Sequence, residues 1–325
     1  MGAEDEFAHG CNLISSQPRA ISYQYIPRAM FRRSFVLLVL LPCSPAAAQA
    51  PGPLREQLAA RVARAPATGV GVYYKSLSRP DSLLLGANLR FHAASTMKVP
   101  VMVQIFRDAD EGLLRLDDSL AVHAAFPSLV DGSPFEVDKA DDSDSTLYRR
   151  VGGKASIREL LELMITRSSN LATNLLIERV GAARAQASAR GLGAWSIQVL
   201  RGVEDGKAYR AGLNNTTTAR DLGALLAAIA QHRAASPSSC EEMLRILGRQ
   251  EFNEGIPVGV PPGTRVAHKT GWIGEVVYHD AALVYPPSGS YVLVVLTGGI
   301  KEDSVAHNLV ADVSRMVWEG VSVRR

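Results

Sequence analysis

Ser95-Thr96-Met97-Lys98 marks the point at which a strand-rich beginning of the chain gives way to a long helical pattern. Residues at positions i and i+3 share one face of a helix, so the Lys98 amine can approach the Ser95 hydroxyl without any long-range folding. A serine hydroxyl is a weak nucleophile until a neighbouring base accepts its proton. Such a tetrad arises by chance about once in a few hundred residues, so the sequence around it decides its meaning.

The chain before the tetrad is typical of a β-hairpin. Residues 69–74 and 82–85 are β-rich runs separated by Arg79-Pro80-Asp81, a turn signal. From residue 95 to about residue 248 the pattern changes to apolar residues spaced three and four apart, which predicts helices. These predicted helices cover residues 97–113, 157–165, 171–180, 218–230 and 241–247.

Strand character returns after Pro261-Pro262-Gly263. We predict strands over 265–270, 276–285 and 291–296, and a closing helix over 304–318. Because both ends of the chain are strand-rich, they most simply pair into one antiparallel sheet, with the closing helix on one face and the helical region on the other. The predicted fold class is therefore α/β. A sheet lobe of residues 51–91 and 263–325 carries an inserted all-α lobe of residues 92–262, and a site lies where the lobes meet.

The first fifty residues have the order of charged, apolar and small residues found in a secretory signal. Arg32-Arg33 precede an apolar run over 35–41, and the small-residue stretch ends at Ala48-Gln49-Ala50. The arginine pair also fits a twin-arginine signal loosely, so export by either route is open. We predict that residues 1–50 are an upstream extension and signal, and that residues 51–325 form an exported catalytic domain, periplasmic or secreted. No apolar run reaches membrane-spanning length, which predicts no membrane span in the mature chain.

Composition excludes several classes of function. With 325 residues, of which 47% are hydrophobic, the chain can bury a full core. A net charge of +3 with both signs mixed offers no basic stripe for nucleic-acid phosphates. Asp141-Asp142-Ser143-Asp144, in the segment 126–150 that reads as a loop rather than an element, lacks the glycine and closing glutamate of a calcium loop. We therefore expect a solvated acidic loop there, and neither a metal nor a cofactor.

Two further motifs follow the tetrad. Ser168-Ser169-Asn170 opens the helix predicted from residue 171, where simple N-capping would also place polar residues. His268-Lys269-Thr270-Gly271 closes a predicted strand, where a lysine and a hydroxyl can face a substrate carboxylate while glycine permits close approach of the backbone. Each motif alone is compatible with a structural role.

Together the three motifs resemble the S-x-x-K, S-D-N and K-T-G set of class A β-lactamases and penicillin-binding proteins. The resemblance extends over nearly all of the mature length. It implies that Ser95 attacks the carbonyl of a β-lactam and becomes acylated, with Lys98 as base or proton relay. It also implies that Ser168 passes a proton to the departing lactam nitrogen.

The same resemblance implies the substrate contacts. Asn170 would bind the amide of the acyl side chain, and Lys269 with Thr270 would hold the substrate carboxylate. The backbone N–H groups of Ser95 and of Trp272, which follows Gly271, would form the oxyanion hole. The implied partner is a small β-lactam or a peptidoglycan stem peptide, and the enzyme is expected to be a monomer.

The sequence departs from the family pattern at two places. Ser169 stands where the family has an aspartate, which could loosen the support of that loop. The family's E-x-x-L-N string, whose glutamate activates the deacylating water, is absent. Aligning on Leu213-Asn214 puts Arg210 at the glutamate position, whereas counting thirty-six residues from Ser168 reaches Glu204, with Asp205 beside it. We predict Glu204 as the water-activating base, since such a carboxylate needs only to hold a water near the ester carbon.

The presence or absence of a deacylating base in this loop decides among three predicted functions. With a deacylating base, the chain is predicted to hydrolyse β-lactams, an activity that serves antibiotic resistance or β-lactam catabolism. Without one, the acyl-enzyme persists, as in a penicillin-binding D-Ala-D-Ala peptidase or transpeptidase, or in a non-catalytic sensor of β-lactams or peptidoglycan. A Ser-His-Asp hydrolase is not favoured, because no G-x-S-x-G elbow is present and His92, His268 and His279 are interpreted as structural.

Overall fold

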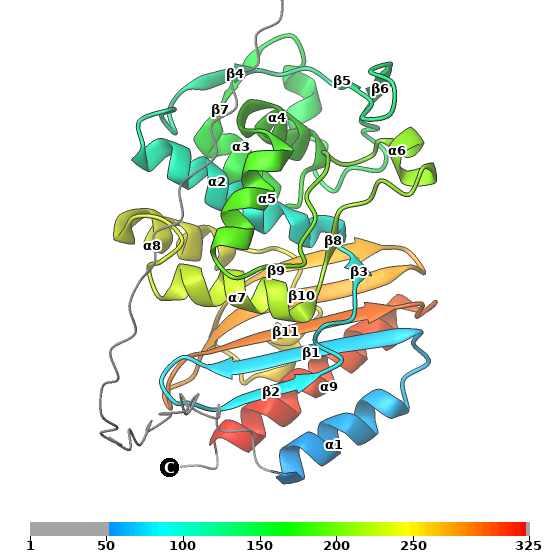
Figure 1. Ribbon diagram of the computed structural model, residues 1–325, viewed down its shortest axis with the longest axis vertical. Coiled ribbons are helices and arrows are strands. Elements are labelled where there is room, and N and C mark those ends of the chain that lie inside the picture. Colours follow the sequence, from blue (N-terminus) through cyan, green and yellow to red (C-terminus); the bar gives the residue numbers. More distant parts are fainter. Residues whose placement is uncertain (1–51, 323–325) are drawn as a thin grey trace, which may run out of the picture. The chain divides into compact units, whose positions relative to one another are not determined.

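The computed structural model describes residues 52–322. The predicted signal over residues 1–50 lies outside this range. A five-stranded antiparallel sheet with the strand order β2-β1-β11-β10-β9 stands at the centre (Figure 1). Its strands are β1 (Gly69–Ser76), β2 (Ser82–Leu85), β9 (Arg265–Ile273), β10 (Val277–Tyr285) and β11 (Tyr291–Gly298). The prediction that the two chain ends pair into one antiparallel sheet is confirmed.

The middle strand of the sheet shows why the strands are apolar at consecutive positions. All eight residues of β11 are buried. Side chains of a strand point alternately to the two faces, and Val292, Val294 and Leu296 join one hydrophobic core while Leu293 and Val295 join the other. Each face of the sheet therefore needs its own cover of helices.

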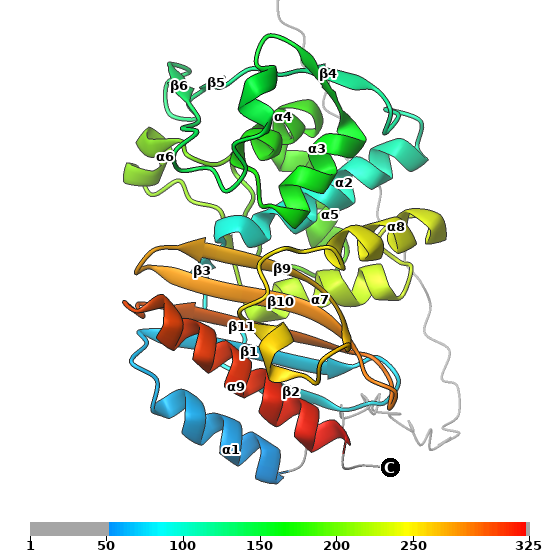
Figure 2. The same ribbon diagram turned by 180° about the vertical axis from the view of Figure 1, so that it is seen from behind.

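Helices from opposite ends of the chain cover one face. The closing helix α9 (Asp303–Ser322) lies on this face with α1 (Gly52–Ala63), while α7 (Ala219–Ala230) packs on the other face (Figures 1 and 2). The prediction that the domain begins with strands is wrong, because α1 precedes β1. Only Leu54 and Leu58 of α1 are buried, so its sequence carries little helical periodicity.

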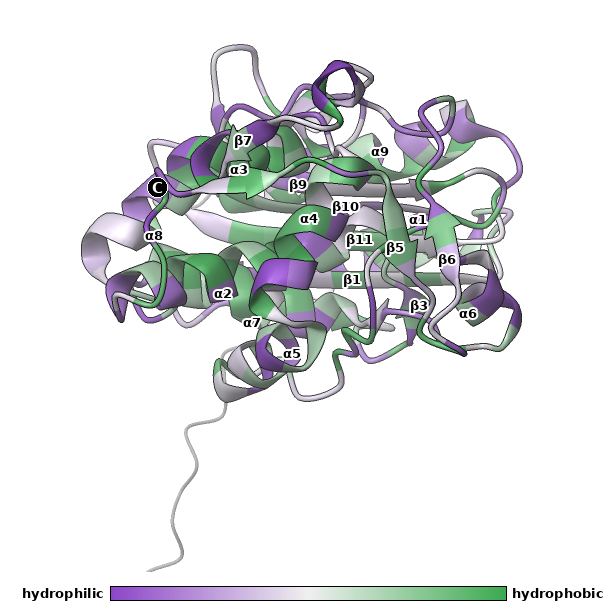
Figure 3. Cartoon of the chain, turned by 90° about the horizontal axis from the view of Figure 1, so that it is seen from above, coloured by the Kyte–Doolittle hydropathy of each residue, from purple (hydrophilic) through white to green (hydrophobic). Residues whose placement is uncertain are grey.

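Helix α2 forms the axis of the helical region and begins with Lys98, directly after the turn that contains Ser95. Ten of its thirteen residues are buried, and Figure 3 shows its hydrophobic colouring among the surrounding helices. The helices of this region are α2 (Lys98–Asp110), α3 (Ile157–Thr166), α4 (Asn170–Val180), α5 (Ala182–Gly191), α6 (Gly206–Arg210) and α8 (Pro237–Leu247). Helices α5 and α6 were not predicted, since α5 buries only two alanines and α6 only one.

The segment 126–150 differs from the loop expected from its sequence. It contains a small hairpin, in which β5 (Ala125–Pro127) pairs with β6 (Pro134–Glu136). The segment ends in the 3-10 turn η2 (Leu147–Arg150). Two further strand pairs are β3 (Phe91–His92) with β8 (Thr216–Thr217) and β4 (Ser119–Ala121) with β7 (Lys154–Ser156). The remaining 3-10 turns are η1 (Ala94–Met97) and η3 (Ile256–Gly259).

Within residues 52–322, none of the helices combines the length and the apolar character needed to cross a membrane.

Candidate active site

A strained turn presents Ser95. The residue lies in η1, so a 3-10 turn stands where the α-helix was expected to begin, and α2 itself starts at Lys98. Ala94 has a φ of 46°, a left-handed conformation that is costly for a residue with a Cβ. The Ala94 N–H donates to His92 Nδ1 at 3.0 Å, and the Thr96 hydroxyl donates to the Ala93 carbonyl at 2.5 Å. These bonds hold the turn in place before the helix begins.

Strand β9 passes very close to this turn. A Cβ at Gly271 would lie 3.1 Å from Thr96 Cγ2 and 3.2 Å from the Ala93 carbonyl oxygen, so only glycine allows the strand to approach the turn without displacement. Lys269, Thr270 and Gly271 lie within β9, which continues to Ile273, and not at the strand end that the sequence predicted. The close approach brings Trp272 and Ser95 to the same cavity, as the predicted oxyanion hole requires.

The Lys98 amine is fully buried and points at the second motif. Its Nζ donates to the Ser168 carbonyl at 2.5 Å, to Ser168 Oγ at 3.1 Å and to Asn170 Oδ1 at 2.9 Å. Among the hydrogen bonds of residues 52–322, none joins this amine to Ser95 Oγ. Burial lowers the pKa of Lys98 to about 7, against the opposing charges of Asp142 and Glu204. A lysine with this pKa is neutral often enough near neutral pH to accept a proton.

A second buried lysine approaches the same hydroxyl. Lys269 Nζ donates to Ser168 Oγ at 3.0 Å and to the Thr270 carbonyl at 2.9 Å. Burial, and after it the charge of Lys98, lowers the pKa of Lys269 well below its usual range. Ser168 Oγ therefore lies between two amines that compete for a proton, which suits a proton relay.

Glu204 reaches the cavity that contains Ser95. Its Oε1 accepts a hydrogen bond from Asn170 Nδ2 at 2.6 Å, and its Oε2 accepts one from the Asp138 N–H at 2.8 Å. Burial raises the pKa of Glu204, while these two hydrogen bonds oppose the shift. With Ser95 and Asn170 it lines a cavity of about 310 Å³, which we call the Glu204 cavity.

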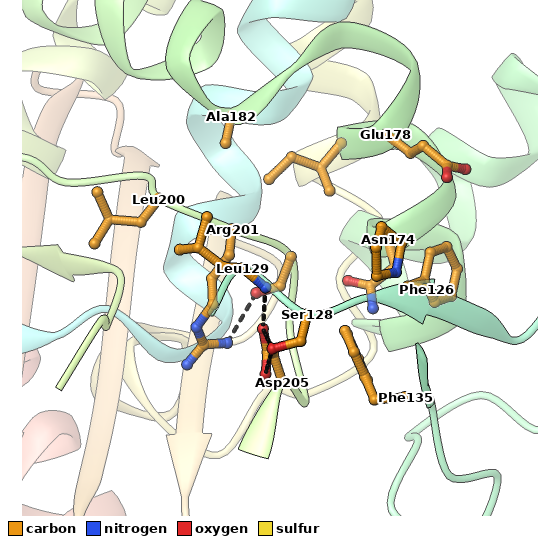
Figure 4. Close-up of a pocket in the computed structure, with 13 residues that line it drawn as sticks. Phe126, Ser128, Leu129, Phe135, Asn174, Glu178, Ala182, Leu200, Arg201 and Asp205 are labelled. Carbon is orange, nitrogen blue, oxygen red and sulfur yellow. Dashed lines mark hydrogen bonds between the residues drawn. The ribbon is translucent and has the colours of Figure 1, made fainter. Parts of the chain in front are cut away.

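The two other candidates in this loop have different places. Asp205 accepts hydrogen bonds from Ser128 Oγ at 3.0 Å, from the Leu129 N–H at 2.8 Å and from the Ala208 N–H at 3.0 Å. It thereby caps α6, and it lines both a neighbouring cavity of about 380 Å³ (Figure 4) and the Glu204 cavity. Arg210 also lines the Glu204 cavity, but a guanidinium cannot act as a base there.

Asn174, which was not predicted from the sequence, anchors the loop just before Glu204. Asn174 on α4 accepts from the Val203 N–H at 2.7 Å and donates to the Val203 carbonyl at 3.0 Å. A Cβ at Gly202 would lie 2.2 Å from Asn174 Oδ1, so the loop approaches α4 only because residue 202 is glycine. That glycine is the one sequence signal that could have indicated the contact.

Asp142 supports α4 in place of the missing aspartate. Its Oδ1 accepts from the Asn170 N–H at 2.9 Å, and its Oδ2 accepts from the Leu171 N–H at 2.9 Å and from the Tyr148 hydroxyl at 3.0 Å. Ser169 caps the same helix through its own hydroxyl, which accepts from the Ala172 N–H. The first N–H groups of a helix lack partners within it and favour a carboxylate. Ser169 therefore leaves this helix start well supported.

The expectation of a solvated acidic loop is wrong for Asp142 and Asp144, whereas Asp141 is exposed. Asp142 is 9% exposed and Asp144 is 2% exposed. Asp144 accepts hydrogen bonds from the N–H and hydroxyl groups of Thr146 and pairs with Arg167. Both carboxylates are held by hydrogen-bond donors in place of water.

Replacing Asp142 by asparagine should both destabilise the protein and change its pH profile. The charged acceptor of two N–H groups is lost, so we expect the free energy of unfolding to fall by about 2 kcal/mol. The Asp142 charge raises the pKa of Lys98, so its removal should move the acid limb of acylation to lower pH. Chemical denaturation and the pH dependence of acylation measure the two effects.

Asp141→Asn is the matched control. Asp141 is exposed, and no hydrogen bond of its side chain occurs in the structure from residue 52 to residue 322. The Asp141→Asn variant should keep the parental stability, and it should shift the acid limb of the pH profile of acylation much less than Asp142→Asn does. An Asp142→Asn protein that loses stability but keeps the parental pH profile would show that Asp142 is a helix cap without influence on Lys98.

The three histidines bond to sheet residues and backbone. His268 Nδ1 pairs with Asp280 at 2.9 Å, and His279 Nε2 bonds to the His92 carbonyl at 2.9 Å. Burial lowers the pKa of His279 to about 4. The buried thiol of Cys240 lies in the helical core, away from the motifs.

Comparison with known proteins agrees with this geometry. Residues 53–321 match the model of the β-lactamase enzyme family. The chain belongs to this family. Its sequence is 25% identical to that of β-lactamase 1 from Streptomyces cacaoi over 267 residues, an alignment that covers 77% of this chain and 79% of that protein.

Solved structures of family members share the fold. PBP-A is 32% identical, with a TM-score of 0.73 over 86% of this chain and 99% of that chain. A β-lactamase from Sphaerobacter thermophilus is 27% identical, with a TM-score of 0.71 over 82% of this chain and 97% of that chain. The predicted β-lactamase-like α/β fold is confirmed.

Proposed function

We propose that the protein hydrolyses β-lactams through an acyl-enzyme on Ser95, as a serine enzyme of the class A type. The observation that carries this proposal is the position of Glu204. Its carboxylate lies in the cavity that contains Ser95, held by Asn170 and by the Asp138 N–H. A carboxylate so held can orient a water and take a proton from it. The β-lactamases among the relatives support the same activity.

Acylation follows from the contacts around Ser168. Neutral Lys98 takes the proton of the Ser95 hydroxyl while Oγ attacks the lactam carbonyl carbon. The C–N bond of the ring breaks, and the proton passes from Lys98 through Ser168 Oγ to the lactam nitrogen. The 3.1 Å contact between Lys98 Nζ and Ser168 Oγ supports this path. The product is an ester of Ser95 with an opened ring.

Binding of the substrate would prepare the base. A substrate carboxylate at Lys269 and Thr270 favours the charged form of Lys269. A charged Lys269 disfavours a second charge on Lys98, since both amines contact Ser168 Oγ. The substrate anion would thus help to keep Lys98 neutral, as the base must be.

Four further groups act on the substrate or on the acyl-enzyme. The N–H groups of Ser95 and Trp272 stabilise the oxyanion, for which Gly271 allows the close approach of β9. The Asn170 amide binds the acyl side chain. In deacylation, Glu204 takes a proton from a water whose oxygen attacks the ester carbon, and the proton returns to Ser95 Oγ as the ester bond breaks.

Likeness to PBP-A favours a second candidate, a penicillin-binding peptidase or transpeptidase acting on peptidoglycan stem peptides. A mutant of PBP-A was solved as an acyl-enzyme complex with penicillin G, at 32% identity to this chain. Acylation is common to both candidates, and the fate of the acyl-enzyme separates them.

We further propose that the enzyme is exported, because residues 1–50 have the order of charged, apolar and small residues found in a signal. We also propose that it acts as a monomer.

Turnover of a chromogenic cephalosporin tests the function. Steady hydrolysis over many turnovers is expected. A burst of product equal to the enzyme concentration, followed by no further hydrolysis, would contradict the proposal. Release of D-alanine from a stem-peptide mimic would then favour the peptidase.

The rate of acylation should fall as the pH falls through about 7. Burial lowers the pKa of Lys98 to about 7, so the amine is neutral above that pH and becomes protonated, and unable to act as a base, below it. We expect a loss of about tenfold per pH unit on the acid side. Stopped-flow acylation measured across neutral pH gives this profile, and a rate that stays flat across it would rule out Lys98 as the titrating base.

A further inference from the structure

A second cavity opens on the other side of Ser95. It encloses about 450 Å³ and is lined by Ser95, Ser168 and Thr270 together with Glu254 and Asp303. We call it the Thr270 cavity. Because Thr270 of the K-T-G motif lines it, a lactam whose carboxylate is held by that residue would direct the neighbouring ring substituent toward this cavity.

The Thr270 cavity is acidic. Neither Glu254 nor Asp303 takes part in an ion pair within the described part of the chain. No lysine or arginine lines the cavity, whose one imidazole, that of His307, packs on the Tyr278 ring. Asp303 Oδ1 accepts a hydrogen bond from Trp272 Nε1 at 2.8 Å, which fixes this carboxylate beside the indole. Two carboxylates without cationic partners would repel an anion that enters and attract a cation.

Aromatic rings form the walls between these carboxylates. Trp272 and Tyr278 are directly paired across β9 and β10, and Phe252 lines the same cavity. Tyr278 is 5% exposed, and its hydroxyl has no hydrogen-bond partner among residues 52–322. Aromatic faces beside carboxylates suit organic cations such as pyridinium or quaternary ammonium groups.

The Glu204 cavity has mixed charge. Arg201 and Arg210 line it together with the carboxylates of Glu204 and Asp205, whereas Glu254 and Asp303 line the Thr270 cavity with no lysine or arginine among the described residues. A cationic ring substituent therefore meets carboxylates without neighbouring guanidinium groups on the Thr270 side.

We propose that the Thr270 cavity is a subsite for a positively charged substituent on the ring side of the β-lactam, next to the substrate carboxylate. This inference rests on the proposed function. The carboxylates of Glu254 and Asp303 supply the charge, and the exposed indole of Trp272 with the ring of Phe252 supplies the faces against which a flat or quaternary cation packs. They act on specificity, and the reacting groups remain those described above.

Two cephalosporins with the same thienylacetyl side chain provide the test. Cephaloridine carries a pyridinium group on its 3-methylene, and cephalothin carries a neutral acetoxy group there. The ratio of their kcat/KM values should fall by about three- to fivefold in Glu254→Gln, by a similar factor in Asp303→Asn and by about tenfold or more in the double variant. Comparing ratios between variants cancels the intrinsic reactivity of the two compounds. Cephalothin alone should be processed faster by the double variant, since repulsion of its carboxylate is reduced.

Glu302→Gln is the matched control. It removes the same charge from the exposed neighbour of Asp303, which does not line the Thr270 cavity, and it should leave the ratio at the parental value. Added salt should lower the parental ratio more than that of the double variant. An unchanged ratio in the double variant, or an equal change in Glu302→Gln, would overturn the subsite. If neither compound acylates Ser95 by mass spectrometry, the proposed function itself fails, and the subsite with it.

Discussion

A Glu204→Gln enzyme is expected to form the acyl-enzyme at nearly the parental rate and then to stop. Glutamine retains the size of the side chain and can still contact Asn170 and the Asp138 N–H, but it cannot take a proton from water. Removal of a general base costs about a hundredfold to ten-thousandfold in rate, so kcat for a penicillin should fall by about a thousandfold. Intact-protein mass spectrometry should show the adduct accumulating on the variant, and not on the parent, within minutes.

Glu136→Gln provides the control for this prediction. Glu136 is an exposed carboxylate on β6, two residues before the backbone group that binds Glu204. Its variant should turn over like the parent. If Glu204→Gln also turns over like the parent, another group activates the water, and the assignment of Glu204 is wrong. If the parent itself accumulates the adduct, the peptidase reading gains support.

A Ser95→Ala enzyme is expected to lose the covalent reaction altogether. Ser168 and Ser143 also present hydroxyls to the Thr270 cavity, but the proposed mechanism places the ester on Ser95, and removal of the nucleophile from a serine hydrolase costs on the order of a millionfold in kcat. The protein should remain folded, because alanine fits in the η1 turn and Ser95 Oγ makes no hydrogen bond within the described residues. Mass spectrometry after incubation with penicillin G should show only the unmodified chain.

Ser143→Ala separates loss of the nucleophile from loss of a hydroxyl in the site. Ser143 lines the Thr270 cavity but lies outside the motifs. Its variant should still be acylated. Acylation of Ser95→Ala, or its absence from Ser143→Ala, would place the ester on another residue and would overturn the mechanism.

The arrangement of the sheet followed from sequence patterns that are local. The hairpin at 69–85 and the three strands after residue 263 lie where alternation and turns placed them. Helix α1 escaped detection because only two of its residues face the core. In the 126–150 segment, acidic composition suggested solvent, whereas the carboxylates bind backbone N–H groups that only become available when α4 forms.

The candidate site also combines features that the local sequence predicts with features that depend on long-range packing. Ser95 and Lys98 are three residues apart, so their placement on one turn follows from helical geometry. The contact of Lys98 with Ser168 spans seventy residues, and the cap that Asp142 places on Asn170 spans twenty-eight. No local pattern encodes such distances, because they depend on how α2, α4 and the acidic segment pack.

By itself the sequence determined the α/β class, the order of the three motifs and the placement of the Ser95 hydroxyl and the Lys98 amine one helical turn apart, because these depend on neighbours along the chain. Tertiary structure alone decided that Glu204 binds Asn170 beside Ser95 while Asp205 binds Ser128, that Asp142 accepts from the first N–H groups of α4, and that Glu254 and Asp303 line the Thr270 cavity. These features arise from burial and from hydrogen bonds between distant segments, whose free energies exist only once the chain has packed.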